Sequence, residues 1–173
     1  EGLLLGRVAD GVENDEFVGY AQVNNIGCIR GDEEDVLERL IYCGDFDDAT
    51  DIFRLTSESP FTYFDLIDEA WAQHVNDKND ATFLDDIIDG CGFEILSLDA
   101  LKRSHNEGED RHRSELCTLY IRENKDKFTI EYIDPPSKLS RKDIRLTVDY
   151  PEDLIVCRSV YNNFKDMAPR IPL

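Results

Sequence analysis

The chain has 173 residues, and its 38 Asp and Glu against 19 Lys and Arg give a formal net charge of −19. This length suits one domain with a full hydrophobic core, and no apolar run approaches the ~18 residues that a membrane-spanning helix needs. Non-specific affinity for nucleic acid rests on Lys and Arg that neutralise phosphates, so the charge argues against a DNA- or RNA-binding protein.

The apolar patterns predict secondary structure in the following chain order. A strand remnant at 3–9 precedes a helix at 13–22, an apolar run at 26–29, a helix at 35–46 and a strand at 49–56. A helix at 62–75, strands at 80–84 and 93–97, a helix at 98–105 and an exposed loop at 106–112 come next. A helix at 113–124, strands at 127–133 and 143–148, and a helix at 151–164 follow. Strands and helices mostly alternate, so we expect one α/β domain, residues 1–173, layered around a largely parallel sheet.

Three of the helices carry recognisable ends or inward faces. The helix at 35–46 is expected to start at Asp32 or Glu33, to end at Gly44, and to bury Val36, Leu37, Leu40 and Ile41. The inward residues are expected to be Ile67, Ala70 and Trp71 in the helix at 62–75, and Val156, Val160 and Phe164 in the last helix.

The five cysteines, at 28, 43, 91, 117 and 157, include no C-x-x-C pair. This odd number argues against a disulfide framework or a zinc site, and a reducing cytoplasm fits best. No signal peptide is visible. The chain begins with Glu instead of Met, so we expect it to be processed or to lack its true start. The acids are spread along the sequence, which predicts a solvated acidic surface such as that of salt-adapted organisms.

Two distant segments share an Arg-Leu-Thr-x-acid run: "RLTSE" ends at Glu58 and "RLTVD" ends at Asp149. Each run closes a predicted strand just before a loop. In an open α/β sheet, ligands bind beyond the carboxyl ends of the strands, so neighbouring strands would bring the two acids together. Mg²⁺ is held by one or two carboxylates and completes its shell with water and phosphate oxygens, so a metal–phosphate site is one interpretation.

A purely structural interpretation of the two acids stays open beside it. Asp149 and Glu152 have the spacing of a capping box, and Pro151 suits the first turn of a helix. Glu58 could favour the positive end of the next helix. Capping leaves the shared Arg-Leu-Thr run unexplained. A more remote alternative is an unrelated acidic phosphohydrolase with Asp149 as its nucleophile.

Several stretches, in order, resemble the cytidylyltransferases of the spore coat polysaccharide protein F type, which are relatives of acylneuraminate cytidylyltransferase and CMP-KDO synthetase. "ENDEFVGYA" and "RGDEEDVLERL" resemble N-D-x-L and R-G-S-x-x-D-V-L-x-R, and "FRLTSESPF" resembles R-x-T-G-D-C-P-L. "DGCGFEILSLDAL" resembles D-G-x-x-x-E-x-x-S-x-x-A-L, and "RSELCTLYIRENKDKFTI" resembles R-E-H-V-T-P-Y-I-x-x-N-x-x-x-F. "RLTVDYPEDL" resembles R-L-T-V-D-T-P-E-D-L most closely. The matches run from about residue 13 to 164.

The resemblance implies a three-layer α/β/α fold of the nucleotide-diphosphosugar transferase type. It also implies a cytoplasmic enzyme of surface polysaccharide synthesis that transfers CMP from CTP to a sugar acid or related acceptor and releases pyrophosphate. Glu58 and Asp149 fall on the family's Mg²⁺-binding, catalytic positions, and Arg54 and Ser57 on its nucleotide side. Glu94, Arg113, Ser114 and Glu115 fall on its acceptor side, with the last three beginning a helix. The partners would be nucleotide and sugar-acid substrates, without nucleic acid or membrane, and the protein would form a homodimer as relatives often do.

The chain departs from the family at several positions. Ser57-Glu58-Ser59 replaces Gly-Asp-Cys, and Leu116 and Leu119 replace His and Pro. The family's first strand and basic loop, Q-A-R-x-x-S-x-R-L-P-G-K, have no counterpart, so we expect an N-terminally incomplete domain. These departures favour the alternative, a catalytically inactive homologue or fragment that serves as a binding or dimerisation module.

Overall fold

The computed structural model describes residues 5–173, so Leu3 and Leu4 of the predicted strand remnant lie outside the described residues. The chain divides into two compact units. The first comprises Glu1–Ile52 and Ser97–Phe128, and the second comprises Phe53–Leu96 and Thr129–Leu173. The backbone therefore passes between the units at three points, and each unit is assembled from two separate stretches of sequence.

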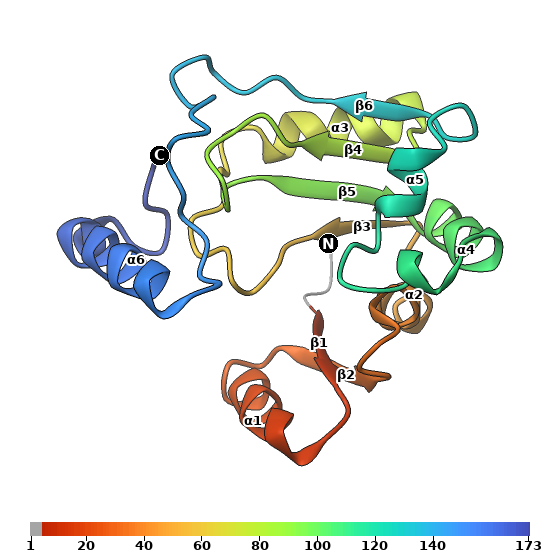
Figure 1. Cartoon of the computed structure of the whole chain (residues 1–173), viewed down its shortest axis with the longest axis horizontal. Helices are drawn as coiled ribbons and strands as arrows, with labels where there is room; N and C mark the ends of the chain where they lie inside the picture. The colour runs from red at the N-terminus through yellow and green to blue at the C-terminus, as the bar shows by residue number, and fades with distance from the viewer. Residues whose placement is uncertain (1–4) are drawn as a thin grey trace. The chain divides into compact units, whose positions relative to one another are not determined.

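The first unit combines a strand pair with helices (Figure 1). Strands β1 (Leu5–Ala9) and β2 (Gly27–Gly31) pair in parallel. The helices are α1 (Asp15–Val23), α2 (Val36–Phe46), α4 (Leu98–Glu107) and α5 (Leu119–Glu123), with single 3-10 turns at Val12–Asn14 and Asp110–His112. The predicted helices at 13–22, 35–46 and 98–105 are thus confirmed to within about two residues.

Helix α2 packs against α4 and begins directly after a capping aspartate. Leu37, Leu40 and Ile41 are buried as predicted. The Asp35 carboxylate accepts the Glu38 N–H at 2.8 Å, so Asp35 caps the helix and the predicted start at Asp32 or Glu33 is wrong. Gly44 lies inside the helix, which ends at Phe46, so the predicted end at Gly44 is wrong. A Cβ at residue 44 would meet Leu98 Cδ1 at 2.7 Å, so a glycine there lets the two helices approach closely.

The second unit holds most of a four-stranded sheet. The strand order is β3 (Asp51–Arg54), β5 (Phe93–Ser97), β4 (Ala81–Leu84) and β6 (Ile130–Tyr132). Strand β4 pairs antiparallel with β5 and parallel with β6. Helices α3 (Ile67–Asp77) and α6 (Pro151–Phe164) and a 3-10 turn at Lys165–Met167 complete the second unit, and α3 contacts β4 (Figure 1). Parallel pairing in β1–β2 and β4–β6 confirms the predicted α/β class.

A single apolar cluster forms the core of the second unit. Its buried members are Phe61, Tyr63, Ala70, Leu84, Ile87, Ile88, Cys91, Phe93, Ile95, Leu139, Leu146 and Cys157. Helix α6 supplies Cys157, and Val160 packs against the cluster. Val156 and Phe164 are 50% and 47% exposed, so their predicted inward orientation is wrong. In α3, Ala70 and His74 are buried, whereas Trp71 is 37% exposed instead of facing inward.

The predicted strand at 143–148 is the main error in the sheet. The segment forms a single isolated bridge, Asp89 with Arg145, and no longer ladder. The Leu146 N–H donates to the Asp89 carbonyl at 2.8 Å, and the Val148 N–H donates to the Glu58 carbonyl at 2.8 Å. Its backbone thus pairs with two loops, and loops offer no continuous row of partners for a strand.

The helix predicted at 62–75 begins later, at Ile67. Phe61 and Tyr63 alternate into the core as an extended chain, and the Tyr63 N–H donates to the Cys91 carbonyl at 2.8 Å. This bond holds the backbone outside a helix until residue 65. Glu58 therefore lies nine residues before the helix starts, too far to interact with its positive end.

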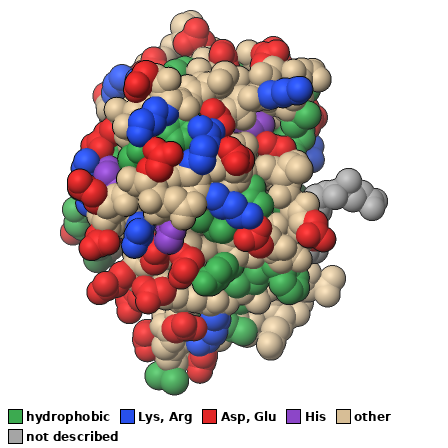
Figure 2. All heavy atoms as spheres, turned by 90° about the vertical axis from the view of Figure 1, so that its right-hand side faces the viewer, with side chains coloured by type: hydrophobic (Ala, Val, Ile, Leu, Met, Phe, Trp, Pro, Cys, Tyr) green, Lys and Arg blue, Asp and Glu red, His purple; other side chains and the backbone are tan. Residues whose placement is uncertain are grey.

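Charged side chains cover much of the surface. Figure 2 shows Asp and Glu side chains scattered over the face in view, with Lys and Arg interspersed among them. This distribution agrees with acids spread along the sequence and not gathered in one tail. Within residues 5–173, no helix combines the length and apolarity needed to cross a membrane.

Candidate functional site

A pocket of about 390 Å³ opens in the second unit. Four of the predicted site residues line it: Arg54, Glu58, Glu94 and Asp149. They come from the end of β3, the loop after it, strand β5 and the loop before α6. The fold thus gathers side chains that lie up to 95 positions apart in the sequence, from Arg54 to Asp149, at one place.

The two loops that carry Glu58 and Asp149 are joined directly. The Glu58 carbonyl oxygen accepts the Val148 N–H at 2.8 Å and the Thr147 hydroxyl at 3.3 Å. The predicted meeting of the two Arg-Leu-Thr-x-acid runs is therefore present. It arises from a loop-to-loop contact, since only the first run ends a strand.

Each Arg-Leu-Thr run places its arginine against an acid of the pocket wall. Arg54 Nη1 donates to Glu94 Oε2 at 2.6 Å, and both side chains are largely buried, with exposed fractions of 13% and 14%. Arg145 Nη1 donates to Asp89 Oδ2 at 3.0 Å. The shared arginines thus brace the two walls, which is a structural reason for the repeated run that capping did not supply.

Asp149 does not cap α6, and the proposed Asp149–Glu152 capping box is wrong. Asp153 Oδ2 instead accepts the N–H groups of Asp149 and Tyr150, each at 3.0 Å, and Pro151 occupies the first turn as predicted. These two backbone donors, together with Arg145, hold the pKa of Asp153 below its usual range. The Asp149 carboxylate is left to pair with Arg145 Nη2.

Glu58 offers the clearest reason to test the pocket for a metal. Its side chain is half-buried in the pocket and has no hydrogen bond or salt bridge to the rest of the described chain. The described residues contain no cluster of three or more His, Cys, Asp or Glu that could hold a metal by itself. Two hard carboxylates fit a cation such as Mg²⁺, which takes its other ligands from water and phosphate. Glu58 and Asp149 are the residues that would hold it.

The turn at 85–92 also contributes to the lining of the pocket, which the sequence did not predict. Asp85, Asp89, Gly90 and Gly92 line the pocket. Gly90 has a φ of +85°, and a Cβ on it would lie 2.7 Å from the Thr147 nitrogen. The glycines of "DGCG" are typical of a turn, but nothing in their spacing indicates which loop this turn touches.

Ser57, predicted on the nucleotide side, is exposed. Its neighbours Thr56 and Ser59 line the pocket instead. Their hydroxyls hydrogen-bond to each other at 3.1 Å, and the Ser59 N–H donates to the Thr56 carbonyl at 3.2 Å. This tight turn carries the side chain of Ser57 outward, so Thr56 is the better candidate for contact with a ligand.

Arg113, Ser114 and Glu115 belong to the first unit and do not start a helix. The Arg113 carbonyl accepts the Leu37 N–H at 3.0 Å, and its guanidinium donates to the His105 carbonyl at 3.3 Å. The segment is therefore used to support the start of α2, and helix α5 begins only at Leu119. The predicted role of these three residues toward an acceptor stays a prediction.

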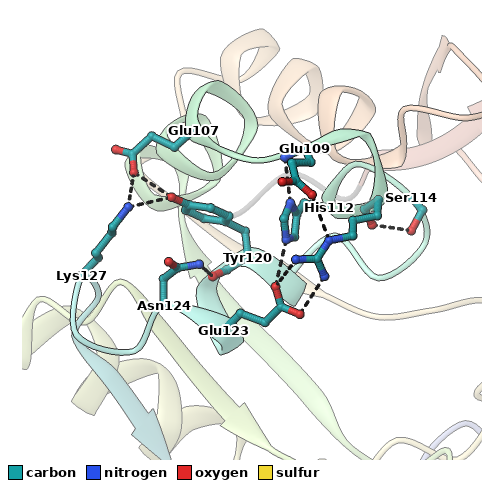
Figure 3. Close-up of polar contacts among 9 residues, drawn as sticks. Glu107, Glu109, His112, Ser114, Tyr120, Glu123, Asn124 and Lys127 are labelled. Carbon is teal, nitrogen blue, oxygen red and sulfur yellow. Dashed lines mark hydrogen bonds and ion pairs between the residues drawn. The ribbon is translucent and has the colours of Figure 1, made fainter.

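A polar network holds the segment at residues 107–127, which contains these three residues (Figure 3). The Glu123 carboxylate accepts Arg111 Nη1 and Nη2, both at 2.8 Å, and His112 Nε2 at 3.0 Å. These donors lower the pKa of Glu123 to about 2. The Glu109 N–H donates to His112 Nδ1 at 2.8 Å, so the buried imidazole has both nitrogens engaged as a neutral ring with its proton on Nε2.

The chain resembles two known proteins in sequence. No family model matches the chain. It is 30% identical over 152 residues to an uncharacterised protein of Methanocaldococcus jannaschii, covering 88% of this chain and 63% of that one. It is 27% identical over 159 residues to the spore coat polysaccharide biosynthesis protein SpsF of Bacillus subtilis, covering 91% and 66%. The chain thus spans less than two thirds of the length of each relative.

The structural comparison concerns the fold. The chain superposes on a cytidylyltransferase from Leptospira borgpetersenii with a TM-score of 0.84 and 20% sequence identity. The match covers 92% of this chain and 68% of the solved one.

Proposed function

We propose that the chain, which belongs to the cytidylyltransferase family of SpsF and has the fold of those enzymes, takes part in transferring CMP from CTP to a sugar acid or related acceptor. Pyrophosphate would be released, and the product would serve surface polysaccharide synthesis. The observation that carries the proposal is the pocket, which brings Arg54, Glu58, Glu94 and Asp149 together in a homologue of SpsF.

The residues that line the pocket would have different roles in binding. Glu58 and Asp149 would hold Mg²⁺, which when bound would neutralise charge on the phosphates. The Arg54–Glu94 pair keeps both side chains fixed, because each satisfies the charge of the other in a largely buried position. The hydroxyls of Thr56 and Ser59 face the same space and can donate to a phosphate or ribose oxygen.

The charge of the pocket supports the proposal that a cation takes part in binding. Asp85 and Asp89 line it beside Glu58, Glu94 and Asp149, whereas Arg54 is the cation among the lining residues and Arg145 pairs with Asp89 and Asp149 from beside the pocket. A bare triphosphate would be repelled by this surface, whereas a metal complex would not. We therefore expect nucleotide binding to depend strictly on a divalent cation.

The test is pyrophosphate release from CTP and Mg²⁺ over a panel of sugar acids, using protein made from the complete gene. We expect release with CTP and little with ATP, GTP or UTP, together with a rise in melting temperature that needs both CTP and Mg²⁺. If CTP with Mg²⁺ neither stabilises the protein nor yields pyrophosphate, the proposal is wrong.

Two variants test the assignment of the acids. Glu58→Gln and Asp149→Asn keep the size of each side chain and remove its charge, so we expect pyrophosphate release to fall by about 100-fold or more. Glu58→Asp restores the carboxylate one methylene shorter and should retain part of the activity. Asp65→Asn, an exposed acid that does not line the pocket, is the control. Unchanged rates in the first two variants would remove Glu58 and Asp149 from the site.

A second candidate is a homologue that binds nucleotide without catalysis. The observation that favours it is the Asp149–Arg145 pair, which leaves one of the two acids already neutralised. Binding of CTP without release of pyrophosphate for any acceptor would select this candidate.

Homodimerisation accompanies either function in our proposal. Exposed apolar side chains on α6, such as Ile155 at 71% and Val156 at 50%, are the kind of surface that a partner would cover. Light scattering of the purified protein gives the mass that decides it.

A further inference from the structure

Arg145 stands among three carboxylates beside the pocket. Its Nη1 donates to Asp89 Oδ2 at 3.0 Å, and its Nη2 donates to Asp149 Oδ2 and, at 3.4 Å, to Asp153 Oδ2. The backbone on either side is also fixed, since Arg145 forms a bridge with Asp89 and the Leu146 N–H donates to the Asp89 carbonyl at 2.8 Å. The guanidinium therefore keeps its place even if one of the three carboxylates leaves it.

The three carboxylates are not equally committed to Arg145. Asp153 already accepts two backbone N–H groups at the start of α6, and Asp89 is tied through its backbone. The carboxylates of Asp89 and Asp149 each have Arg145 as their partner within the described residues, and of the two Asp149 lies on the loop that is joined to Glu58. Asp149 is thus the acid that a cation held together with Glu58 would take over from Arg145.

We propose that Arg145 is a resident counter-ion of the pocket, which pairs with Asp149 until a divalent cation arrives together with a polyphosphate. This inference rests on the proposed function and deepens it. A bare cation that binds Asp149 must displace the Arg145 guanidinium from this carboxylate, and it brings no other anion for the guanidinium to pair with. A cation that carries phosphate groups supplies that anion, while Asp89 and Asp153 keep Arg145 in place. The pocket thereby selects a metal–polyphosphate complex over the free metal.

The first arm of the test measures bare Mn²⁺ binding by electron paramagnetic resonance, without nucleotide. Arg145→Gln removes the competing charge, so we expect its affinity for Mn²⁺ to rise about two- to fivefold, the range set by exposed ion pairs. Arg145→Lys keeps the charge and should remain near the wild type. Asp149→Asn should bind Mn²⁺ more weakly than the wild type.

The second arm repeats the titration with CDP, a polyphosphate that cannot release pyrophosphate. Here we expect Arg145→Gln to bind the Mn²⁺–CDP pair more weakly, because the guanidinium that meets the phosphate is gone. The opposite signs of the two arms separate a counter-ion from a residue that merely supports the fold, whose loss would weaken both.

Arg141→Gln is the matched control. Arg141 lies in the same segment, forms a two-point pair with exposed Asp143 at 2.7 and 2.6 Å, and does not line the pocket. Its removal changes the net charge equally and should leave both affinities near the wild type. Circular dichroism of every variant checks the fold, and Arg145→Lys carries the comparison if the Gln variant does not fold: we then expect weaker Mn²⁺–CDP binding than in the wild type, because an ammonium cannot make the forked contact.

Several results would overturn the inference. Weaker or unchanged Mn²⁺ binding in Arg145→Gln contradicts a competing counter-ion, and so does a wild-type protein that binds bare Mn²⁺ as tightly as Mn²⁺–CDP. Absence of Mn²⁺ binding in all variants would also refute it. If the Mn²⁺ and Mn²⁺–CDP affinities change as expected but no pyrophosphate is released, the enzymatic proposal is refuted and the role of Arg145 is retained.

Discussion

At the scale of single residues, Gly90 sets the shape of the pocket. Its φ of +85° lies in the left-handed region, and a Cβ there would meet Thr147 N at 2.7 Å and Leu146 C at 2.8 Å. Backbone atoms cannot move aside as a flexible side chain can. Gly90 thus allows the turn at 85–92 to touch the segment that carries Thr147 and Asp149, and no other residue type fits without strain.

We expect Gly90→Ala to lower the free energy of unfolding by about 1–3 kcal/mol or more, the cost of forcing a side chain into this backbone conformation. Urea denaturation measures the effect. Gly19→Ala is the control, because Gly19 lies in α1 with open space where its Cβ would be. That substitution should stabilise the protein by up to about 1 kcal/mol. Equal stability of the two variants would contradict the strain argument.

At the scale of elements, the sequence predicts the strongly periodic helices and strands well. It does not predict segments whose structure depends on hydrogen bonds to distant parts of the chain. The strands at 80–84 and 93–97 and the helices at 35–46 and 151–164 were predicted from sequence and lie within about two residues of those positions. The strand at 143–148 and the early starts of α3 and α5 were wrong, because hydrogen bonds to distant loops decide those segments. Propensity describes a segment by itself, so it does not include the Tyr63–Cys91 and Leu37–Arg113 backbone bonds.

The candidate site, too, could be predicted only where the sequence pattern itself was informative. The two acid-bearing loops were found from their repeated Arg-Leu-Thr run, and both line one pocket. Asp89, Gly90 and Arg145 were missed as contributors, since a turn of acids and glycines gives no indication of its spatial neighbours. The role of Asp153 at the start of α6 was missed because Glu152 has the usual capping-box spacing from Asp149. The N-cap residue is instead Tyr150, whose N–H the Asp153 carboxylate accepts.

The segment around α5 gives a prediction of pH dependence. Arg111 and His112 lower the pKa of Glu123 to about 2, from an ordinary value of about 4.3 in an unfolded chain. A carboxylate with a depressed folded pKa stabilises the fold fully above its unfolded pKa, and that contribution disappears as the pH falls toward 2. We expect the stability gap between the wild type and Glu123→Gln to be constant above about pH 5.5, to shrink below 4.5, and to vanish near 2.

Chemical denaturation at a series of pH values measures this gap. Glu16→Gln, which alters an exposed acid of α1, is the control and should show little gap at any pH. A Glu123→Gln gap that grows on acidification would have the wrong sign and would contradict the assignment of its partners.

At the scale of the whole molecule, the excess of acids dominates. The net charge of −19 is spread over the surface (Figure 2), so its repulsion opposes the compact state. Individual ion pairs such as Lys102–Asp45, at 2.5 Å, do not remove this excess. Screening by salt should therefore matter more for this protein than for one of balanced charge.

We expect the melting temperature to rise between about 0.01 M and 0.15 M NaCl, where the Debye length falls from about 30 to 8 Å. KCl at the same ionic strength should give the same rise, because screening depends on charge and concentration. A melting temperature that stays constant or falls over this range would show that surface ion pairs outweigh the repulsion.

The bond from the Val148 N–H to the Glu58 carbonyl affects which substitutions the two loops can accept without moving apart. It is made by main-chain atoms that almost every residue carries, so substitution of the neighbouring side chains leaves it in place. Ser57-Glu58-Ser59 stands where the resembled family pattern has Gly-Asp-Cys, and the two loops still meet in this structure. The meeting of the two loops therefore rests on the backbone and not on which acid stands at position 58.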